Sequence, residues 1–292
     1  MQQLNITKEE LIQKLQEIKR RGWVHTRRSK NDGAVGNTLE DLLGIKENNF
    51  SIANTVDWEL KSQRAETSSL ITLFHLDPKP RKPDSIVANF LLPRYGWPHK
   101  EAGKKYPGNE MSFRATLCGN RFTDRGLRVN VNSVKRRVEI VFDPSRVDKR
   151  HEEWLKHTIK MDGEGPMKVV PYWDFDELAR KCVGKIRNTI FVVAESRKVN
   201  GQEQFKYNKI TLLQDFAFNN LLRAIINGYV FVDFDARTGH NHGTKFRISQ
   251  GSWPVLYSKI TEIKDDSVDT HIVSKSDLPV IPKQKKLTDM EH

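Results

Sequence analysis

Charged and apolar side chains alternate in the segment VDWELK, residues 56–61. This period of two predicts a half-buried β-strand whose polar face carries Asp57, Glu59 and Lys61. Residues two apart on such a face lie about 6–7 Å from each other. Glu59 can then bind Mg²⁺ while Lys61 reaches the attacking water or a phosphate oxygen, as metal-dependent phosphodiester hydrolysis requires. Acid-x-base patterns also occur on strands that simply face solvent, and the strand alone leaves that alternative open.

A second group of polar residues occupies the segment DARTGHNHGTKFR, residues 235–247. His240 and His242 are spaced like a metal-binding pair on a strand. No further ligand is evident beyond Asp235, however, and a structural zinc site normally needs four. Arg247 could instead donate two hydrogen bonds to guanine, and the histidines offer single donors or acceptors to bases. A polar turn with an arginine at a strand edge remains the alternative.

The chain is strongly basic. Its 292 residues include 49 Lys or Arg and 37 Asp or Glu, which gives a net charge of +12. Such an excess suits a protein that neutralises the phosphates of a nucleic acid, although it also favours solubility. Arg237 is a weaker candidate for the same surface as Arg247. Phosphate contacts are expected from three short basic runs: Lys19 to Arg21; Arg27, Arg28 and Lys30; and Lys135, Arg136 and Arg137. The alternative for each run is solvated surface.

The cysteines and the hydropathy pattern indicate the cellular compartment of the protein. Cys118 and Cys182 fit neither a paired zinc spacing nor a disulfide framework. The first residues show no signal-peptide pattern, and no run of about 18 apolar residues could span a bilayer. We therefore expect a cytoplasmic protein without a membrane partner.

Three helices are expected around these motifs. Residues 7–21 combine a capping box, formed by Thr7 and Glu10, with an apolar stripe. The segment TLEDLLG predicts a short helix capped by Thr38. Residues 208–227 predict a long amphipathic helix that ends at Gly228.

Strand patterns fill much of the remaining chain. The run SSLITLFHL is expected to be buried on both faces. Further strands are predicted in MSFRATLCG, LRVNVNS, RVEIVFD and NTIFVVAES, and on both sides of the polar turn within residues 229–248. Trp23 is expected to anchor the core, and residues 275–292 to form a disordered tail. Helices and strands without regular βαβ alternation predict a mixed α/β or α+β fold.

The stretches GNTLEDLLGI and IANTVDWELKSQRAETSSLITLFHL resemble the MvaI/BcnI restriction endonucleases, relatives of MutH within the PD-(D/E)xK nuclease fold. RGWVHTRRSKNDGAVGN and HNHGTKFRI extend the resemblance, whereas residues 85–205 match poorly. It implies a central mixed sheet flanked by helices, in two lobes around a DNA cleft. Residues 1–270 would form the nuclease, with the catalytic core around residues 1–80 and the recognition elements around residues 205–265.

The resemblance also implies roles for individual residues. Glu59 corresponds to the metal-binding carboxylate and Lys61 to the catalytic lysine. Glu40 corresponds to an additional acid on a helix, with an exposed helix acid as the alternative. The family's first metal-binding aspartate stands five residues before the glutamate, where this chain has Asn54. An amide oxygen can coordinate Mg²⁺ but brings no charge, so we expect Asp57 to help complete the metal shell.

The activity implied by the resemblance is that of a type II restriction endonuclease. Such a monomer hydrolyses double-stranded DNA with Mg²⁺ at a short GC-rich site, one strand at a time, and a DNA methyltransferase protects the host. The segment that contains His240, His242 and Arg247 would read bases in the major groove. A MutH-like nicking enzyme that depends on repair proteins is the closest alternative. A catalytically silent DNA-binding protein also stays open because of Asn54.

Asn54 and Asp57 generate a testable prediction. If Asp57 shares the coordination, Asp57→Asn should sharply raise the Mg²⁺ concentration for half-maximal cleavage, because only neutral amides would remain beside Glu59. Asn54→Asp should lower that concentration or leave activity intact. A metal titration of the parent and both variants on one cognate duplex measures these shifts. An active parent that is indifferent to Asp57→Asn would contradict the shared coordination, and an inactive parent rescued by Asn54→Asp would show that the asparagine silences the site.

Overall fold

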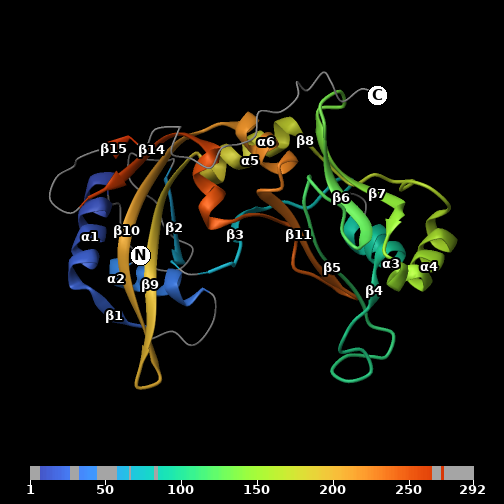
Figure 1. The fold of residues 1–292 in the computed structure, drawn as a ribbon, viewed down its shortest axis with the longest axis horizontal. Helices are drawn as coiled ribbons and strands as arrows, with labels where there is room; N and C mark the ends of the chain where they lie inside the picture. The colour runs from blue at the N-terminus through green and yellow to red at the C-terminus, as the bar shows by residue number, and fades with distance from the viewer. Residues whose placement is uncertain are drawn as a thin grey trace. The chain divides into compact units, whose positions relative to one another are not determined.

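The computed structural model of the protein describes residues 7–26, 33–44, 58–65, 67–81, 85–264 and 271–272. The chain divides into two compact units, which we call the first and the second unit. The first is drawn from Met1–Ser69, Cys182–Ala217 and Trp253–Pro279, and the second from Leu70–Lys181, Phe218–Ser252 and Val280–His292. Each unit therefore combines segments that are far apart in the sequence, as the colours of Figure 1 show. The predicted tail, residues 275–292, lies outside the described residues.

A mixed sheet forms the centre of the first unit. Its order is β15 (His271–Ile272), β14 (Tyr257–Ile263), β10 (Gln202–Phe216), β9 (Asn188–Val199) and β2 (Trp58–Arg64), and β1 (Trp23–His25) also pairs with β10. β2 runs parallel to β9, while the other pairs are antiparallel. The mixed sheet expected for the catalytic core is therefore present.

Two helices cover one face of this sheet: α1 (Lys8–Arg21) and α2 (Ala34–Leu43). Leu11, Leu15 and Ile18 of α1 are buried against apolar residues of β9 and β10. Trp58 and Leu60 of β2 pack against the same cluster. The hydroxyl of Tyr207 on β10 donates to a carbonyl of α2 at 2.7 Å. Burial on this face therefore decides which side chains of β2 remain on the opposite face.

The two predicted N-terminal helices have different outcomes. α1 is confirmed, since Thr7 and Glu10 form both hydrogen bonds of the capping box. α2 begins four residues before the expected cap, at Ala34, so the prediction that Thr38 caps it is wrong. Thr38 is buried inside the helix and donates to the Thr26 hydroxyl at 2.7 Å. The buried face of α2 extends to Ala34 and Val35, which adds an N-terminal turn.

The long helix predicted for residues 208–227 is also wrong. β10 continues to Phe216, and only α6 (Phe218–Ile226) is helical. β10 is hydrogen-bonded to β9 on one side and to β14 on the other, and Ile210, Leu212 and Leu213 are all buried. A strand in that position is apolar on both faces, and its continuous apolar run has no period that separates it from a helix.

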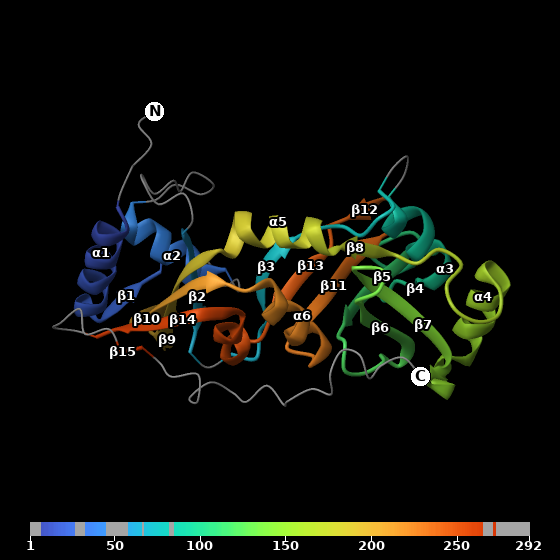
Figure 2. The ribbon, with the colours of Figure 1, turned by 90° about the horizontal axis from the view of Figure 1, so that it is seen from above.

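The second unit contains two sheets. The larger has the order β3 (Ile71–His75), β13 (Lys245–Ile248), β11 (Val230–Arg237), β5 (Met111–Leu117) and β4 (Trp97–Pro98), with β12 (His240–Asn241) paired to β11 (Figure 2). The smaller joins β6 (Arg125–Asn132), β7 (Arg137–Val147) and β8 (Tyr172–Asp174). The strands predicted in these segments are confirmed. β3 is an edge strand, although Ile71, Leu73 and Phe74 are buried.

Short helical segments complete the described chain: η1 (Val87–Leu91), α3 (Leu92–Tyr95), η2 (Lys149–His151), α4 (Glu152–Asp162), α5 (Phe175–Ile186) and η3 (Gln250–Leu256). No described helix is long and apolar enough to cross a membrane. Both cysteines are buried free thiols. The mixed α/β fold predicted from the sequence is confirmed.

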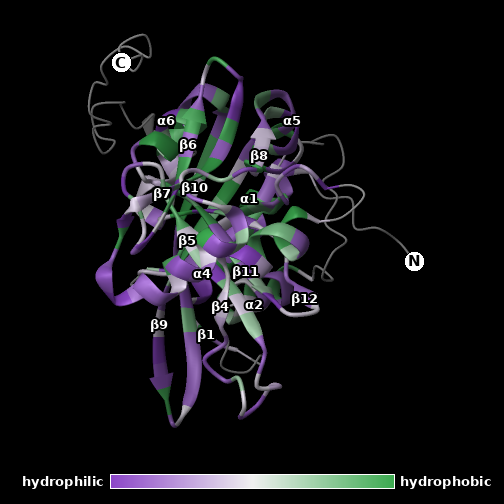
Figure 3. Cartoon of the chain, turned by 90° about the vertical axis from the view of Figure 1, so that its right-hand side faces the viewer, coloured by the Kyte–Doolittle hydropathy of each residue, from purple (hydrophilic) through white to green (hydrophobic). Residues whose placement is uncertain are grey.

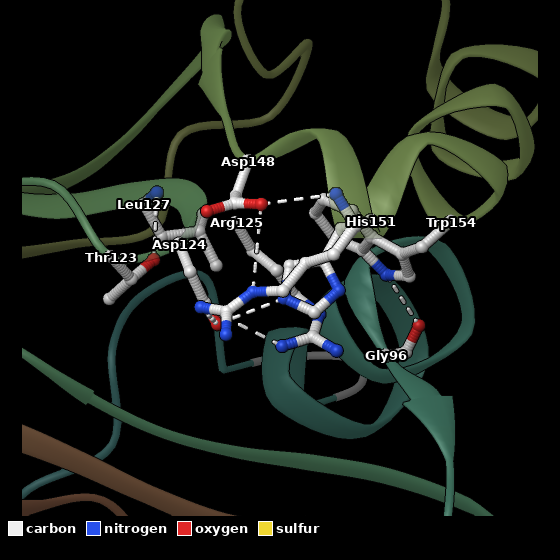
Figure 4. A network of polar contacts seen from close by, with 9 residues as sticks. Gly96, Thr123, Asp124, Arg125, Leu127, Asp148, His151 and Trp154 are labelled. Carbon is white, nitrogen blue, oxygen red and sulfur yellow. Dashed lines mark hydrogen bonds and ion pairs between the residues drawn. The ribbon is translucent and has the colours of Figure 1, made fainter.

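A polar network joins η2 and α4 to the start of β6 (Figure 4). The Asp124 carboxylate contacts His151 Nε2 and Arg150 Nη2, both at 2.9 Å. Partial burial raises the pKa of Asp124, but the His151 hydrogen bond and the nearby arginines outweigh it and hold that pKa below its usual value. The Trp154 indole donates to the Gly96 carbonyl at 2.9 Å. These contacts fasten the helices to the sheets of the second unit.

Candidate active site and polar sheet face

Glu59 and Lys61 form an ion pair on β2, with Lys61 Nζ 2.7 Å from Glu59 Oε1. Their side chains are 33% and 31% exposed, so solvent or a ligand can reach both. Because Trp58 and Leu60 point into the core, the pair lies on the face of the sheet that α1 and α2 do not cover. The alternation predicted for this strand is therefore confirmed over the described residues 58–61.

Residues of the neighbouring strand β9 lie beside the Glu59–Lys61 pair and are held in place by buried contacts. Glu59 is opposite Thr189 on β9, and Lys61 is opposite Phe191. The Thr189 hydroxyl lies 2.9 Å from the Tyr257 hydroxyl, which donates to a backbone carbonyl at 2.9 Å. Burial raises the pKa of Tyr257, so its hydroxyl keeps its proton. Buried neighbours lower the local dielectric, and the Glu59–Lys61 attraction is stronger than it would be in water.

Several predicted site residues are not placed by the structure. Asn54, Asp57, Arg27 and Arg28 lie outside the described residues. Glu40 is half-buried on α2, which packs against β2 in the first unit. Within the described ranges, no three His, Cys, Asp or Glu side chains are grouped to hold a metal ion.

The HNH segment forms a turn between β11 and β13 in the second unit. His240 and His242 are exposed, and their ring centroids lie 4.2 Å apart at an interplanar angle of 81°. Since the described residues group no third metal ligand with them, the zinc alternative loses its geometric support. Both rings remain accessible to a ligand.

Asp77, which follows β3, holds this turn in place. Its Oδ1 accepts from the Thr244 amide at 2.7 Å and from the Thr244 hydroxyl at 2.8 Å. Its Oδ2 accepts from the Asn241 side chain at 3.4 Å, and Asn241 Oδ1 accepts from the Gly243 amide at 3.0 Å. Gly243 has a φ of +79°, which favours glycine. Sequence reasoning missed Asp77, because its partner lies 167 positions away.

Arg247 is held by two oxygen atoms. Its Nη1 lies 3.1 Å from Asp233 Oδ2, and its Nη2 donates to the Leu70 carbonyl at 2.8 Å. Asp233 also accepts from the Thr116 hydroxyl at 2.7 Å. The guanidinium therefore sits in one orientation on the polar face of the larger sheet.

Other bases on this face are paired in the same way. Arg237 contacts Glu110 at 3.0 Å, and Arg114 contacts Asp235 at 2.8 Å. The period of two in VFVDFDAR, residues 230–237, puts Asp233, Asp235 and Arg237 on one face. That alternation could have identified the two acids as part of the surface. Their cross-strand partners needed the register of the sheet.

The basic run at the turn between β6 and β7 is only partly available. Arg137 is paired with Glu139, and its guanidinium lies 4.7 Å from the Tyr172 ring centroid. Arg136 contacts Asp176 at 3.1 Å but stays largely exposed. Lys135 is exposed, and its amide donates to the Asn132 side chain. Of the three, Lys135 and Arg136 are exposed to solvent.

Comparison with known proteins identifies a family, and two structures of one enzyme are among the similar solved structures. The model of the MvaI/BcnI restriction endonuclease family matches residues 12–257. The structure of restriction endonuclease MvaI in complex with a cognate DNA substrate is 26% identical, with a TM-score of 0.68, and the match covers 88% of this chain and 98% of that one. The structure of MvaI without DNA is 25% identical, with a TM-score of 0.49 and coverages of 88% and 99%. None of the curated proteins compared matches the chain. The expected PD-(D/E)xK-type fold is confirmed by the first structure.

The Asp77 contacts generate a prediction about the turn. In Asp77→Ala, deuterium uptake by peptides that cover residues 240–244 should rise roughly tenfold or more in rate, because each hydrogen bond to a charged acceptor is worth about 1.5–3 kcal/mol. Thr244→Val, which loses only the hydroxyl bond, should give a smaller rise. Peptides from α1 in the first unit serve as the internal control. Unchanged uptake in both variants would show that Asp77 does not hold the turn.

Proposed function

Because the chain belongs to the MvaI/BcnI restriction endonuclease family, we propose that it hydrolyses double-stranded DNA as a Mg²⁺-dependent type II enzyme at a short GC-rich site. The observation that carries this proposal is the Glu59–Lys61 pair, which combines a carboxylate and an amine at 2.7 Å on an accessible strand face. The family match supports the reaction class, and the pair supports the position of the site.

The proposed metal ligands suit Mg²⁺, which prefers oxygen atoms. Glu59 supplies a carboxylate on this face, and Asp57 with Asn54 would supply further oxygens from the preceding segment. Glu40 is proposed as an additional acid of the site. Because α2 covers the opposite face of the sheet, Glu40 would have to reach the site around the β2 edge. Bound Mg²⁺ would supply Lewis-acid polarisation of the phosphate and a more acidic water.

Lys61 would act on the water and the phosphate rather than on the bases. Its ammonium lies at the next outward position after Glu59, so a phosphate near the carboxylate is within reach of its three donors. It can orient the attacking water or balance the negative charge of a non-bridging oxygen. Glu59 keeps the flexible lysine at this place when no substrate is bound.

Base recognition is proposed for the polar face and turn of the second unit. His240, His242 and Arg237 would contact base edges, and Arg247 would pair with guanine O6 and N7. A guanidinium has five N–H donors, and Arg247 uses two of them toward Asp233 and Leu70, which leaves donors for a base. Lys135, Arg136 and Arg137, with Arg27 and Arg28, would position the duplex through phosphates.

The biological setting follows from the same proposal. The enzyme would work as a monomer and cut one strand at a time, alongside a DNA methyltransferase that protects the host sites. One rival rests on a specific observation, since Asn54 removes a charged ligand and would suit a silent DNA-binding protein. A nuclease and a silent DNA-binding protein would both retard DNA on a gel in Ca²⁺. Only the nuclease would cut a plasmid library in Mg²⁺, and sequencing of the cut ends would give the site.

Lys61→Ala is expected to abolish cleavage and leave specific binding nearly intact, since the lysine does not contact bases. Glu59→Ala should behave similarly but also weaken metal binding. Cleavage of a cognate duplex in Mg²⁺ and binding in Ca²⁺ measure the two effects. Lys259→Ala, which removes an exposed lysine of β14, is the matched control. Cleavage at the wild-type rate by either site variant would show that Glu59 and Lys61 are not the active site.

Arg247→Ala is expected to weaken cognate binding much more than random-sequence binding. The loss of a bidentate guanine contact costs about 1–3 kcal/mol of discrimination. Neutralising Lys135, Arg136 and Arg137 together should weaken all duplexes alike and flatten the salt dependence. Titrations with cognate and random duplexes at several salt concentrations separate the two cases. Equal losses on both duplexes for Arg247→Ala would exclude it from base recognition.

A further inference from the structure

Strands β9 and β10 extend beyond the end of β2 in the first unit as a ribbon, and β1 pairs with the base of this ribbon at residues 204–206. Pairing with β2 ends at Ala194, whereas β9 and β10 stay paired to their turn at Asn200 and Gly201. These two residues have φ angles of +50° and +78°, as tight hairpin turns require. Residues 195–202 are exposed, and Figure 3 colours most of the free end of β9 as hydrophilic. The ribbon is therefore a polar extension of the sheet.

One face of the ribbon continues the face that carries Glu59 and Lys61. Lys61 is paired with Phe191, and strand alternation puts Arg197 on the same side of β9 as Phe191. Gln204 of β10 is opposite Arg197, and His25 of β1 is opposite Gln204. The other side is identified independently, because the alternate residues Ala194, Phe205 and Tyr207 belong to the core beneath α1 and α2.

Four side chains on this face form a connected cluster, which we call the ribbon surface: Trp23, His25, Arg197 and Gln204. The Arg197 guanidinium carbon lies 4.1 Å from the ring centroid of Trp23. Arg197 Nε donates to Gln204 Oε1 at 2.8 Å, and Gln204 Nε2 is 2.9 Å from a ring nitrogen of His25. Trp23, expected in the core, is only half-buried and serves as the platform for the arginine.

This arrangement prepares Arg197 to bind an anion. Its Nε donates a hydrogen bond to the buried Gln204, and its guanidinium carbon lies over the Trp23 ring. Among the residues that the structure describes, neither Nη atom has a hydrogen-bond partner, and the side chain is exposed. A planar fork held in one orientation loses little entropy when it binds a phosphate bidentately. Gln204 and Trp23 thus orient a free donor pair.

We infer that the ribbon surface binds the sugar–phosphate backbone of the duplex whose scissile phosphate lies at Glu59 and Lys61. This inference rests on the proposed function. Arg197 follows Phe191 by six residues, which at about 3.3 Å per residue is roughly 20 Å along the strand. A duplex whose axis follows β9 rises about 3.4 Å per base pair, and the proposal then places the contact about six base pairs from the scissile phosphate. It lies in flanking DNA and adds affinity without reading sequence.

Duplex length provides the test. Binding is measured in Ca²⁺ to a short cognate duplex that ends about 4 base pairs from the scissile phosphate on each side, and to a long one that extends about 10 base pairs. Counted from the scissile phosphate, these ends bracket the expected contact. Arg197→Ala should weaken binding to the long duplex about tenfold and lower its salt slope by about 1, as the loss of one charge-assisted phosphate contact predicts. Binding to the short duplex should not change.

Lys198→Ala is the matched control, because it removes the same charge from the next residue, which alternation puts on the opposite face of the ribbon. It should affect both duplexes little. Equal losses on the long and short duplexes for Arg197→Ala, or equal losses for the two variants, would overturn the ribbon surface while the nuclease proposal stands. A parent protein that binds neither duplex would overturn both.

Discussion

The pairing register of β2 with β9 is the constraint on which the candidate active site depends. In that register Trp58 and Leu60 join the core beneath α1 and α2, and Glu59 with Lys61 is left on the open face. A slip by one residue would exchange the two sets and bury both charges. Burial of the apolar side chains therefore fixes the direction of the charged ones. The ion pair is a consequence of this register, since a half-exposed pair contributes little stability by itself.

The same sheet face links the site to the ribbon. β9 carries Phe191 beside Lys61 and Arg197 farther along, so one continuous strand sets the spacing between two places that a polyanion could occupy. Strands are stiff and regular, and that spacing does not depend on a loop. The buried Gln204 and the Trp23 ring then orient the arginine at the far position.

In the second unit, acidic residues organise the basic ones. Asp233 and Asp235 contact Arg247 and Arg114, and Asp77 shapes the turn that carries the two exposed histidines. Each acid lowers the net positive charge of the surface but restricts its partner to one orientation. For a surface proposed to read bases, such restriction favours specificity over raw attraction, because misplaced donors cannot meet base edges.

The sequence by itself determined the mixed α/β class, α1 with its capping box, the alternation of β2, and the family resemblance. These are local properties, set by residues a few positions apart. Only the tertiary structure decided that residues 208–216 form a strand, because pairing on both sides buries both faces and removes the period. It also decided the start of α2 and the roles of Asp77 and Trp23. Asp77 acts on Thr244, and Trp23 acts on Arg197. The folded sheets bring the two members of each pair together, which leaves no signal in the sequence.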